Sequence, residues 1–303
     1  MKKVIGYCIF FLTFFLVVYS FREEIGNFIY KNFVLEDIQI SEFEPNKYYR
    51  PVDYSYVQIT DDFIAKDEQH LLNIYYTIVN AGADTFTFAC DNEYKECLND
   101  VGDLSNNQSV LSNINSFVHP FNGFSSVETT YDSLGRVEIK VNKAYSAGEI
   151  KLVEEKVQSI IDTKLKGITD QEAIIKKLHD YIIETTKYDT DRSDYNIVKY
   201  KSDLAYGPLL EGYGLCGGYT DTMALFLDYY NIPNFKVISE THVWNAVYIN
   251  DEWRHLDLTW DDPVTTSGKD LIEYKFFLID TISLFNIEKE EHNFDINVFK
   301  ELE

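Results

Sequence analysis

The stretch Gly214-Leu215-Cys216-Gly217-Gly218-Tyr219 is followed directly by an apolar run typical of a helix. A cysteine here lies where the helix begins, and the N–H groups and positive dipole end of a helix N-terminus favour the thiolate, the form that attacks carbonyl carbons. Gly217 and Gly218 would let a substrate carbonyl approach backbone N–H groups that stabilise an oxyanion. The alternative for one cysteine beside an apolar helix is a small buried apolar side chain.

A second stretch, Thr241-His242-Val243-Trp244-Asn245-Ala246-Val247-Tyr248-Ile249, alternates apolar residues as a strand does and supplies a histidine as general base. Asn250-Asp251 separates it from a second strand, which predicts a β-hairpin with Tyr248 opposite Trp253. His242 and Asp257 then fall near the open ends of the paired strands. A carboxylate beside the imidazole fixes its tautomer and stabilises the imidazolium, which in turn holds a nearby cysteine as thiolate.

Together, Gly-Leu-Cys-Gly-Gly-Tyr, His-Val-Trp-Asn and His-Leu-Asp-Leu-Thr-Trp-Asp-Asp-Pro resemble the transglutaminase-like superfamily over roughly residues 170–265. The resemblance implies that Cys216 is the nucleophile, that His242 is the general base and acid, and that Asp257 orients His242. It also implies an α+β, papain-like core in which the nucleophile helix packs on an antiparallel sheet. We expect no cofactor. His179-Asp180-Tyr181-Ile182-Ile183 and Tyr188-Asp189 resemble the helix and loop before the nucleophile in bacterial members, and we expect them to be structural.

Residues near the motifs have competing interpretations. His255 lies two residues before Asp257, on the same side of the strand, and is a rival general base. Trp244 and Trp260 are candidates for substrate binding, as is Gly217, and the alternative for each tryptophan is core packing.

Two further features concern polar groups near the motifs. Asp261 and Asp262 lack the additional ligands of a zinc or calcium pattern, so we expect an exposed loop and no metal site. Tyr188 is a candidate hydrogen-bond donor near the active site, although its spacing does not place it.

The N-terminus predicts contact with a membrane. Lys2-Lys3 precede an uncharged apolar run over residues 4–21, whose 18 residues suit a short membrane anchor or the core of a signal peptide. An Ala-x-Ala cleavage pattern is missing, which favours the anchor. The positive-inside rule places the N-terminus in the cytoplasm. We therefore expect an extracellular catalytic domain on the cell membrane, or a secreted protein if the segment is cleaved.

Charge and cysteine content agree with export. The net charge of -23, from 27 basic and 50 acidic residues, argues against nucleic acid as a partner. Cys8 lies in the apolar run, and Cys90 and Cys97 are close enough in sequence to bridge a short loop, although sequence alone does not decide whether they do. Cys216 is left unpaired, as a nucleophile requires.

Four segments are expected: a signal anchor or signal peptide at 1–21, a spacer at 22–53, a small α+β domain at 54–145 and the catalytic domain at 146–303. Residues 73–79 and 84–88 suit strands or short helical pieces, and 125–131 and 136–141 predict a hairpin with Gly135 in a left-handed conformation. Capping-box patterns at Ser146–Glu149 and Thr169–Glu172 predict two amphipathic helices.

These parts predict cysteine-dependent acyl transfer on protein or peptide amides through a thioester. Water as acceptor would make the enzyme a protease or amidase, and a lysine amine would make it a cross-linking transferase. Cell-wall or host surface proteins are the expected substrates. The alternative is a non-catalytic surface binding or adhesion module that uses the same scaffold, with residues 54–145 making the contact.

Overall fold

The computed structural model describes residues 2–30, 32, 44–263 and 271–303. Within them, a four-stranded sheet β1-β2-β4-β3 and a three-stranded sheet β7-β8-β9 make a mixed α+β protein, as predicted. Met1, residues 31 and 33–43 of the predicted spacer, and residues 264–270 of the predicted catalytic domain lie outside the described residues.

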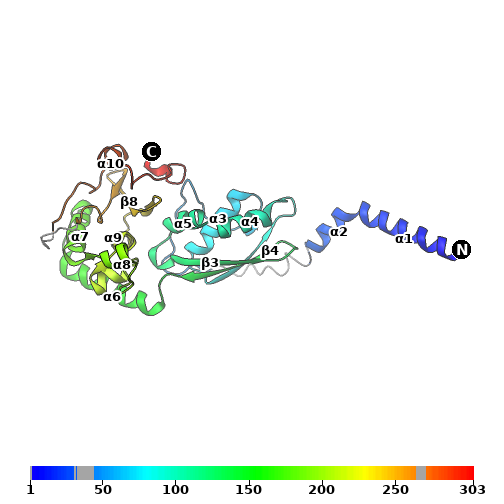
Figure 1. Ribbon diagram of the computed structural model, residues 1–303, viewed down its shortest axis with the longest axis horizontal. Helices are drawn as coiled ribbons and strands as arrows, with labels where there is room; N and C mark the ends of the chain where they lie inside the picture. The colour runs from blue at the N-terminus through cyan, green and yellow to red at the C-terminus, as the bar shows by residue number, and fades with distance from the viewer. Residues whose placement is uncertain (1, 31, 33–43, 264–270) are drawn as a thin grey trace.

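The N-terminal segment forms helix α1 (Lys2–Ser20) and helix α2 (Arg22–Ile29), which extend away from the rest of the chain (Figure 1). Among the described residues, no helix combines the length and apolar character needed to cross a membrane.

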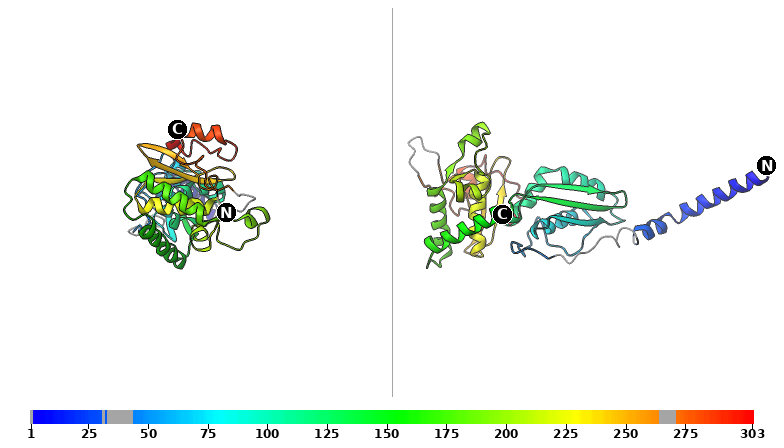
Figure 2. Two further views of the ribbon diagram at one scale, coloured as in Figure 1. Left: turned by 90° about the vertical axis from the view of Figure 1, so that its left-hand side faces the viewer. Right: turned by 90° about the horizontal axis from the view of Figure 1, so that it is seen from below.

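The region after the spacer places three helices along one sheet (Figures 1 and 2). Its elements are β1 (Ile64–Ala65), α3 (Glu68–Asn80), β2 (Thr85–Cys90), α4 (Cys97–Asn106), α5 (Gln108–Ser116), the short η2 (Pro120–Asn122), β3 (Phe124–Tyr131) and β4 (Arg136–Lys143). Residues 73–79 are therefore helical and 85–88 are in a strand. The β3–β4 hairpin is confirmed, with Gly135 at φ 88°. A disulfide joins Cys90 at the end of β2 to Cys97 at the start of α4.

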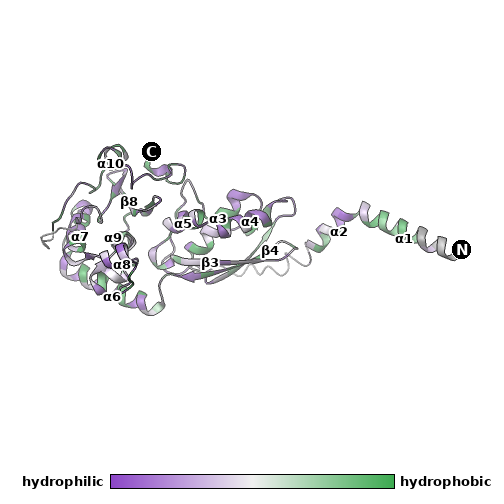
Figure 3. Cartoon of the chain, in the orientation of Figure 1, coloured by the Kyte–Doolittle hydropathy of each residue, from purple (hydrophilic) through white to green (hydrophobic). Residues whose placement is uncertain are grey.

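The next region is mainly helical. It contains α6 (Ala147–Lys164), α7 (Gln171–Thr185), β5 (Lys187–Tyr188), α8 (Thr190–Tyr195), η3 (Gly207–Glu211), β6 (Tyr213–Gly214) and α9 (Cys216–Tyr229). The capping box of Ser146 and Glu149 is present at α6. The cap of α7 is Asp170 rather than Thr169, because the Asp170 carboxylate accepts the N–H of Ala173. Polar and apolar residues alternate along α6 and α7, as expected for helices with one face in the core (Figure 3).

The second sheet carries the two motif strands. Its strands are β7 (Asn234–Ile238), β8 (Val243–Ile249) and β9 (Glu252–Leu256), all antiparallel, and α10 (Thr281–Ile287) and η4 (Lys300–Leu302) follow. The predicted hairpin is confirmed: Tyr248 pairs with Trp253. Asn250 and Asp251 have φ of 53° and 64°, the left-handed pair that a tight two-residue turn between twisted strands requires.

This sheet is the middle layer between two apolar clusters. Trp244 and Ala246 face a cluster that contains side chains from residues 54–141 and 276–302. Val247 and Ile249 point to the opposite face of the strand, where they contact a cluster built from α6, α7 and α9. Helix α9, which begins with Cys216, therefore packs on an antiparallel sheet, as expected. The boundary between the predicted domains stays a prediction, since the first region and the sheet share one cluster.

The predicted spacer contributes one buried charge to this arrangement. Arg50 is 9% exposed, and its Nη2 lies 2.9 and 2.7 Å from the two carboxylate oxygens of Asp228, near the end of α9. Its Nη1 donates to the carbonyl of Asn234 at 3.2 Å, where β7 begins. The spacer thus holds the end of the nucleophile helix against the sheet.

Candidate active site

The site begins with the cysteine at the start of α9. Cys216 is the first residue of this helix, is partly exposed and is a free thiol. The preceding residue, Leu215, offers no side-chain cap. The N–H groups of the first turn have no acceptor within the helix, so they and the helix dipole stabilise a negative charge placed beside them.

The two glycines after Cys216 are needed for packing within the chain. A Cβ at Gly217 would lie 2.7 Å from the carbonyl oxygen of Asp203, and a Cβ at Gly218 would overlap the carbonyl of Ser202. The backbone at 202–203 therefore lies directly against both glycines and leaves no room for a side chain at either position. Gly217 still borders a cavity, described below, so substrate contact there stays a prediction.

The start of α9 is tied to the start of β8. The Thr220 hydroxyl donates to the Cys216 carbonyl at 2.7 Å and lies 3.1 Å from the carbonyl of Val243. The Asn245 amide donates to the Thr220 carbonyl at 3.1 Å. Because Val243 directly follows His242, these bonds hold the thiol and the imidazole in a fixed relation.

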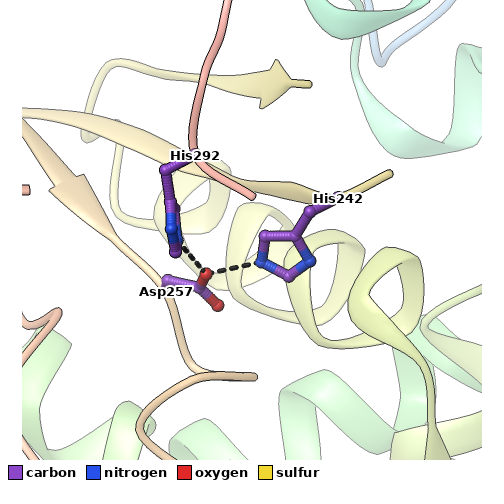
Figure 4. Close-up of side chains that lie close together, drawn as sticks. All are labelled: His242, Asp257 and His292. Carbon is purple, nitrogen blue, oxygen red and sulfur yellow. Dashed lines mark hydrogen bonds and ion pairs between the residues drawn. The ribbon is translucent and has the colours of Figure 1, made fainter. Parts of the chain in front are cut away.

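His242 and Asp257 meet at the open end of the hairpin, as predicted. His242 immediately precedes β8 and Asp257 immediately follows β9. Nε2 of His242 lies 2.6 Å from Oδ2 of Asp257, and both residues are buried (Figure 4). The other carboxylate oxygen of Asp257 accepts the N–H of Thr259 at 2.9 Å and that of Trp260 at 3.3 Å. Burial raises the pKa of Asp257, but His242 and a second histidine, His292, hold it well below its usual range.

Cys216 also acts on the imidazole. Nε2 of His242 faces Asp257, so Nδ1 is the ring nitrogen left for another partner, and the Cys216 side chain is close enough to raise the pKa of His242. Burial lowers the pKa of His242, whereas the Asp257 carboxylate and the Cys216 side chain outweigh burial and raise it to about 10. An imidazole that stays protonated near neutral pH can pair with a thiolate and protonate a leaving amine.

A fourth residue, His292, joins the triad and was missed by sequence reasoning. It is fully buried, and its Nε2 lies 2.9 Å from Oδ2 of Asp257 (Figure 4). Its Nδ1 lies 2.9 Å from Oε2 of Glu288. The segment at 288–292 matches no motif, and its one local signal is the four-residue spacing of Glu288 and His292.

Three of the residues described above are of the types that bind metal ions in proteins. His242, Asp257 and His292 offer ligand atoms within 4.8 Å of one another. Zinc would hold such atoms at about 2.0–2.2 Å from the ion. Here Oδ2 of Asp257 lies directly between the two ring nitrogens, at 2.6 and 2.9 Å. Hydrogen bonds account for this geometry, and we assign none of the three as a metal ligand.

His255, the rival base, is occupied elsewhere. It is fully buried, and its Nδ1 accepts the indole N–H of Trp244 at 2.9 Å. Its Nε2 lies 3.0 Å from the hydroxyl of Thr281. Burial lowers the pKa of His255 to about 3, so the ring is neutral and has both nitrogens engaged in the core. His242 is therefore the base that the structure makes available.

The two tryptophans surround the triad from the core side. Trp244 is 1% exposed and stacks on His242 with ring centroids 5.7 Å apart, which corresponds to the core-packing alternative. Trp260 is partly buried, with its ring 5.4 Å from that of His292. Substrate contact by Trp260 stays a prediction.

The prediction that Asp261 and Asp262 lie in an exposed loop is wrong for Asp261. Asp261 is fully buried, its Oδ2 lies 3.2 Å from Nε2 of His179, and its Oδ1 accepts the N–H of Phe276 at 3.0 Å. Asp262 accepts the hydroxyl of Tyr219 at 2.5 Å. Both carboxylates therefore anchor the loop after the triad aspartate to the helical layer.

Tyr188 lies beside the nucleophile. In the parallel pair β5–β6, Tyr188 is opposite Gly214, two residues before Cys216. Burial, followed by the charge of Cys216, raises the pKa of Tyr188, so its hydroxyl keeps its proton near neutral pH. The structure thus places Tyr188 near Cys216, which the spacing in the sequence alone could not do.

A cavity of about 470 Å³ adjoins the site. One side is formed by Ser112, Asn115 and Ser125 of the first region, and another by Gly217 and Val243. The last two residues directly follow Cys216 and His242 in the chain. A larger cavity of about 530 Å³, bordered by His119 and Asp228, lies near the opposite end of α9. Asp228 is twelve positions further along α9 than Cys216, which corresponds to a distance of about 18 Å along the helix axis.

Comparisons with known proteins give weak likenesses. No protein-family model and no curated protein matches the chain. The chain is similar to the crystal structure of a TGase, at 13% identity and a TM-score of 0.35, over 51% of this chain and 48% of that one. It is also similar to a candidate cysteine protease from Cytophaga hutchinsonii, at 13% identity and a TM-score of 0.29, over 48% of this chain and 65% of that one. The chain thus spans less than two thirds of either protein.

The charge on His242 predicts how stability depends on pH. Its pKa is about 10 in the folded protein, against about 6.5 in an unfolded chain. A raised folded pKa gives stability that is fully present below the unfolded value and is lost as pH rises through the folded value. The free energy of unfolding should therefore fall between about pH 6.5 and about pH 10, by several kcal/mol more in the wild type than in His242→Gln. Urea unfolding at stepped pH measures both curves, and parallel curves would show that His242 is not the titrating group.

Proposed function

We propose that this chain is a cysteine-dependent enzyme that acts on protein or peptide amides by acyl transfer through a thioester. The observation that carries the proposal is a buried His242–Asp257 contact of 2.6 Å, with the Cys216 side chain close enough to raise the pKa of the same imidazole. Nucleophile, base and orienting carboxylate come from three separate elements. Such a constellation is the recurring arrangement for activating a weak nucleophile.

The chemistry divides into two halves. The thiolate of Cys216 attacks the amide carbonyl, and a C–S bond forms as the carbonyl oxygen takes the negative charge. The imidazolium of His242 then gives its proton to the leaving amine as the C–N bond breaks, which leaves a thioester. In the second half, neutral His242 removes a proton from the incoming water or amine as its oxygen or nitrogen forms a bond to the acyl carbon. The C–S bond then breaks, which releases the acid or the new amide and restores the thiolate.

Two groups are suited to stabilising the oxyanion. Backbone N–H groups at the start of α9 have no acceptor within the helix, and the Tyr188 hydroxyl lies close enough to Cys216 to feel its charge. Donors aimed at the developing oxyanion stabilise the transition state more than the ground state. We assign Tyr188 this role within the proposal.

In this proposal the substrate is a protein or peptide segment that binds in the 470 Å³ cavity bordered by Gly217 and Val243. Serine and asparagine side chains from the first region supply hydrogen-bonding groups there. In this proposal, residues 54–145 contribute to substrate binding and do more than space the catalytic part from its surroundings. The choice between transfer to an amine and hydrolysis depends on how well water is excluded from the thioester.

The site of action in this proposal is outside the cytoplasm. The Cys90–Cys97 disulfide supports it, because disulfides persist in oxidising compartments. The apolar run at 4–21 supports an anchor on the cell membrane, or a secreted form if it is cleaved. Cell-wall or host surface proteins are then the proposed substrates.

Incubation with a glutamine-rich protein and an amine probe tests the activity. Mass spectrometry distinguishes cross-linked, deamidated and cleaved products, and Cys216→Ala should abolish whichever product forms because the thiolate that carries the acyl group is gone. Glu172→Gln, an exposed change on α7, is the control and should leave the rate unchanged. Product formation by a folded Cys216→Ala variant would refute the proposal.

Tyr188→Phe tests the oxyanion role. Removal of one donor from an oxyanion site typically lowers kcat by about 10²–10³-fold. We expect a loss of this order with little change in KM, since the donor acts on charge present only in the transition state. Steady-state kinetics on the identified substrate measures both constants. Unchanged kcat, or a loss confined to KM, would remove Tyr188 from the mechanism.

A further inference from the structure

His292 is bonded by a carboxylate at each of its ring nitrogens. Nε2 lies 2.9 Å from Asp257 and Nδ1 lies 2.9 Å from Glu288. The Glu288 carboxylate also accepts the N–H of Glu290 at 2.8 Å and that of Glu291 at 3.0 Å. The Asp257 carboxylate accepts two further backbone N–H groups. A carboxylate that accepts this many hydrogen bonds is stabilised in its ionised form.

These contacts determine how many of the two ring nitrogens of His292 carry a proton. An ionised carboxylate accepts hydrogen bonds and cannot donate them, whereas neutral imidazole has one N–H and one acceptor nitrogen. Each nitrogen of His292 faces an ionised carboxylate, so each must carry a proton. The side chain is therefore an imidazolium, buried between two anions.

The surroundings of His292 hold the ring in this orientation. The Phe276 ring stacks on it at 5.1 Å between centroids, and those of Trp244 and Trp260 lie at 4.8 and 5.4 Å. Aromatic faces attract a cation. The titratable groups around it are Asp257, Glu288, the His242 ring at 5.3 Å, and His255, whose pKa is lowered first by burial and then by the charge of His292.

We propose that His292, held by Glu288, is a positioning residue for the triad carboxylate. It completes a line of alternating charges from Cys216 through His242, Asp257 and His292 to Glu288. His292 fixes Oδ2 of Asp257 at the point where His242 bonds it, and its charge compensates a buried carboxylate whose other cationic partner loses its charge in the proposed reaction. This inference rests on the proposed function, because positioning matters only if the triad is catalytic.

The geometry assigns each member of the line a separate task. His242 changes charge during turnover when it gives its proton to the leaving group. During that step Asp257 would face a neutral ring, and an uncompensated buried carboxylate is costly. His292 remains charged throughout, so Asp257 keeps a cationic partner and its orientation while His242 is neutral.

Three variants separate positioning from packing. His292→Phe keeps an aromatic ring for stacking but removes both N–H groups. His292→Asn keeps one N–H donor that can reach Asp257. Glu288→Gln removes the outer charge, and Glu290→Gln is the matched control because it makes the same change on an exposed neighbour.

Nitrogen-15 NMR of labelled, full-length protein reads the protonation of His292 directly and needs no substrate. Near neutral pH both ring nitrogens should show the imidazolium signature in the wild type and in Glu290→Gln. In Glu288→Gln the signal of Nδ1 should change, because its anionic hydrogen-bond partner is gone. A neutral His292 ring in the wild type would overturn the proposal, as would a spectrum that Glu288→Gln leaves unchanged.

Kinetics on the identified substrate gives the second readout. His292→Phe should lower kcat by about 10- to 100-fold with KM unchanged, the loss expected for one hydrogen bond to a charged group. His292→Asn should recover part of that loss. Unchanged kcat in a folded His292→Phe protein would overturn the positioning role, and equal losses in both variants would do the same. Absence of turnover in the wild type would refute the proposed function, while the NMR result would still decide the charge on His292.

Discussion

The hydrogen bond between Nε2 of His242 and Oδ2 of Asp257, 2.6 Å long and buried, is the constraint on which the rest of the site depends. It selects which ring nitrogen faces Cys216, and together with that thiol it raises the pKa of His242 to about 10 against the effect of burial. A displacement of the carboxylate would return the imidazole to the neutral form that burial favours. The proposed chemistry therefore depends on how firmly Asp257 is held.

The fold holds this bond from both faces of one small sheet. A hairpin with a two-residue turn sets the register that brings His242 and Asp257 to the same open end. On one face, α9 delivers Cys216 and is tied to β8 through Thr220 and Asn245. On the other, the C-terminal segment delivers His292 into a cluster shared with the first region. The catalytic part thus depends on segments distant in sequence, and its stability and its chemistry have a common structural basis.

Local patterns predicted the parts of the site that depend on neighbouring residues. The Gly-rich approach to a helix placed Cys216, and strand alternation around Asn250-Asp251 gave the correct pairing of Tyr248 with Trp253. Contacts between residues distant in the chain have no such local pattern in the sequence. His292 is a lone histidine in an acidic segment, and the buried Asp261 is paired with His179, 82 residues away. The contact of Gly217 with the carbonyl of Asp203 is likewise not visible in the sequence, and substrate contact at Gly217 stays a prediction.

The most direct test of the central claim is the rate at which iodoacetamide alkylates Cys216 near neutral pH, in the wild type and in Asp257→Asn. Alkylation follows the thiolate, and the thiolate depends on an imidazolium that Asp257 sustains. The account predicts that Asp257→Asn slows alkylation of Cys216 by at least about tenfold, the effect of a one-unit change in pKa, with the fold intact by circular dichroism. Equal rates in the two proteins would contradict it, because the thiol would then be independent of the carboxylate.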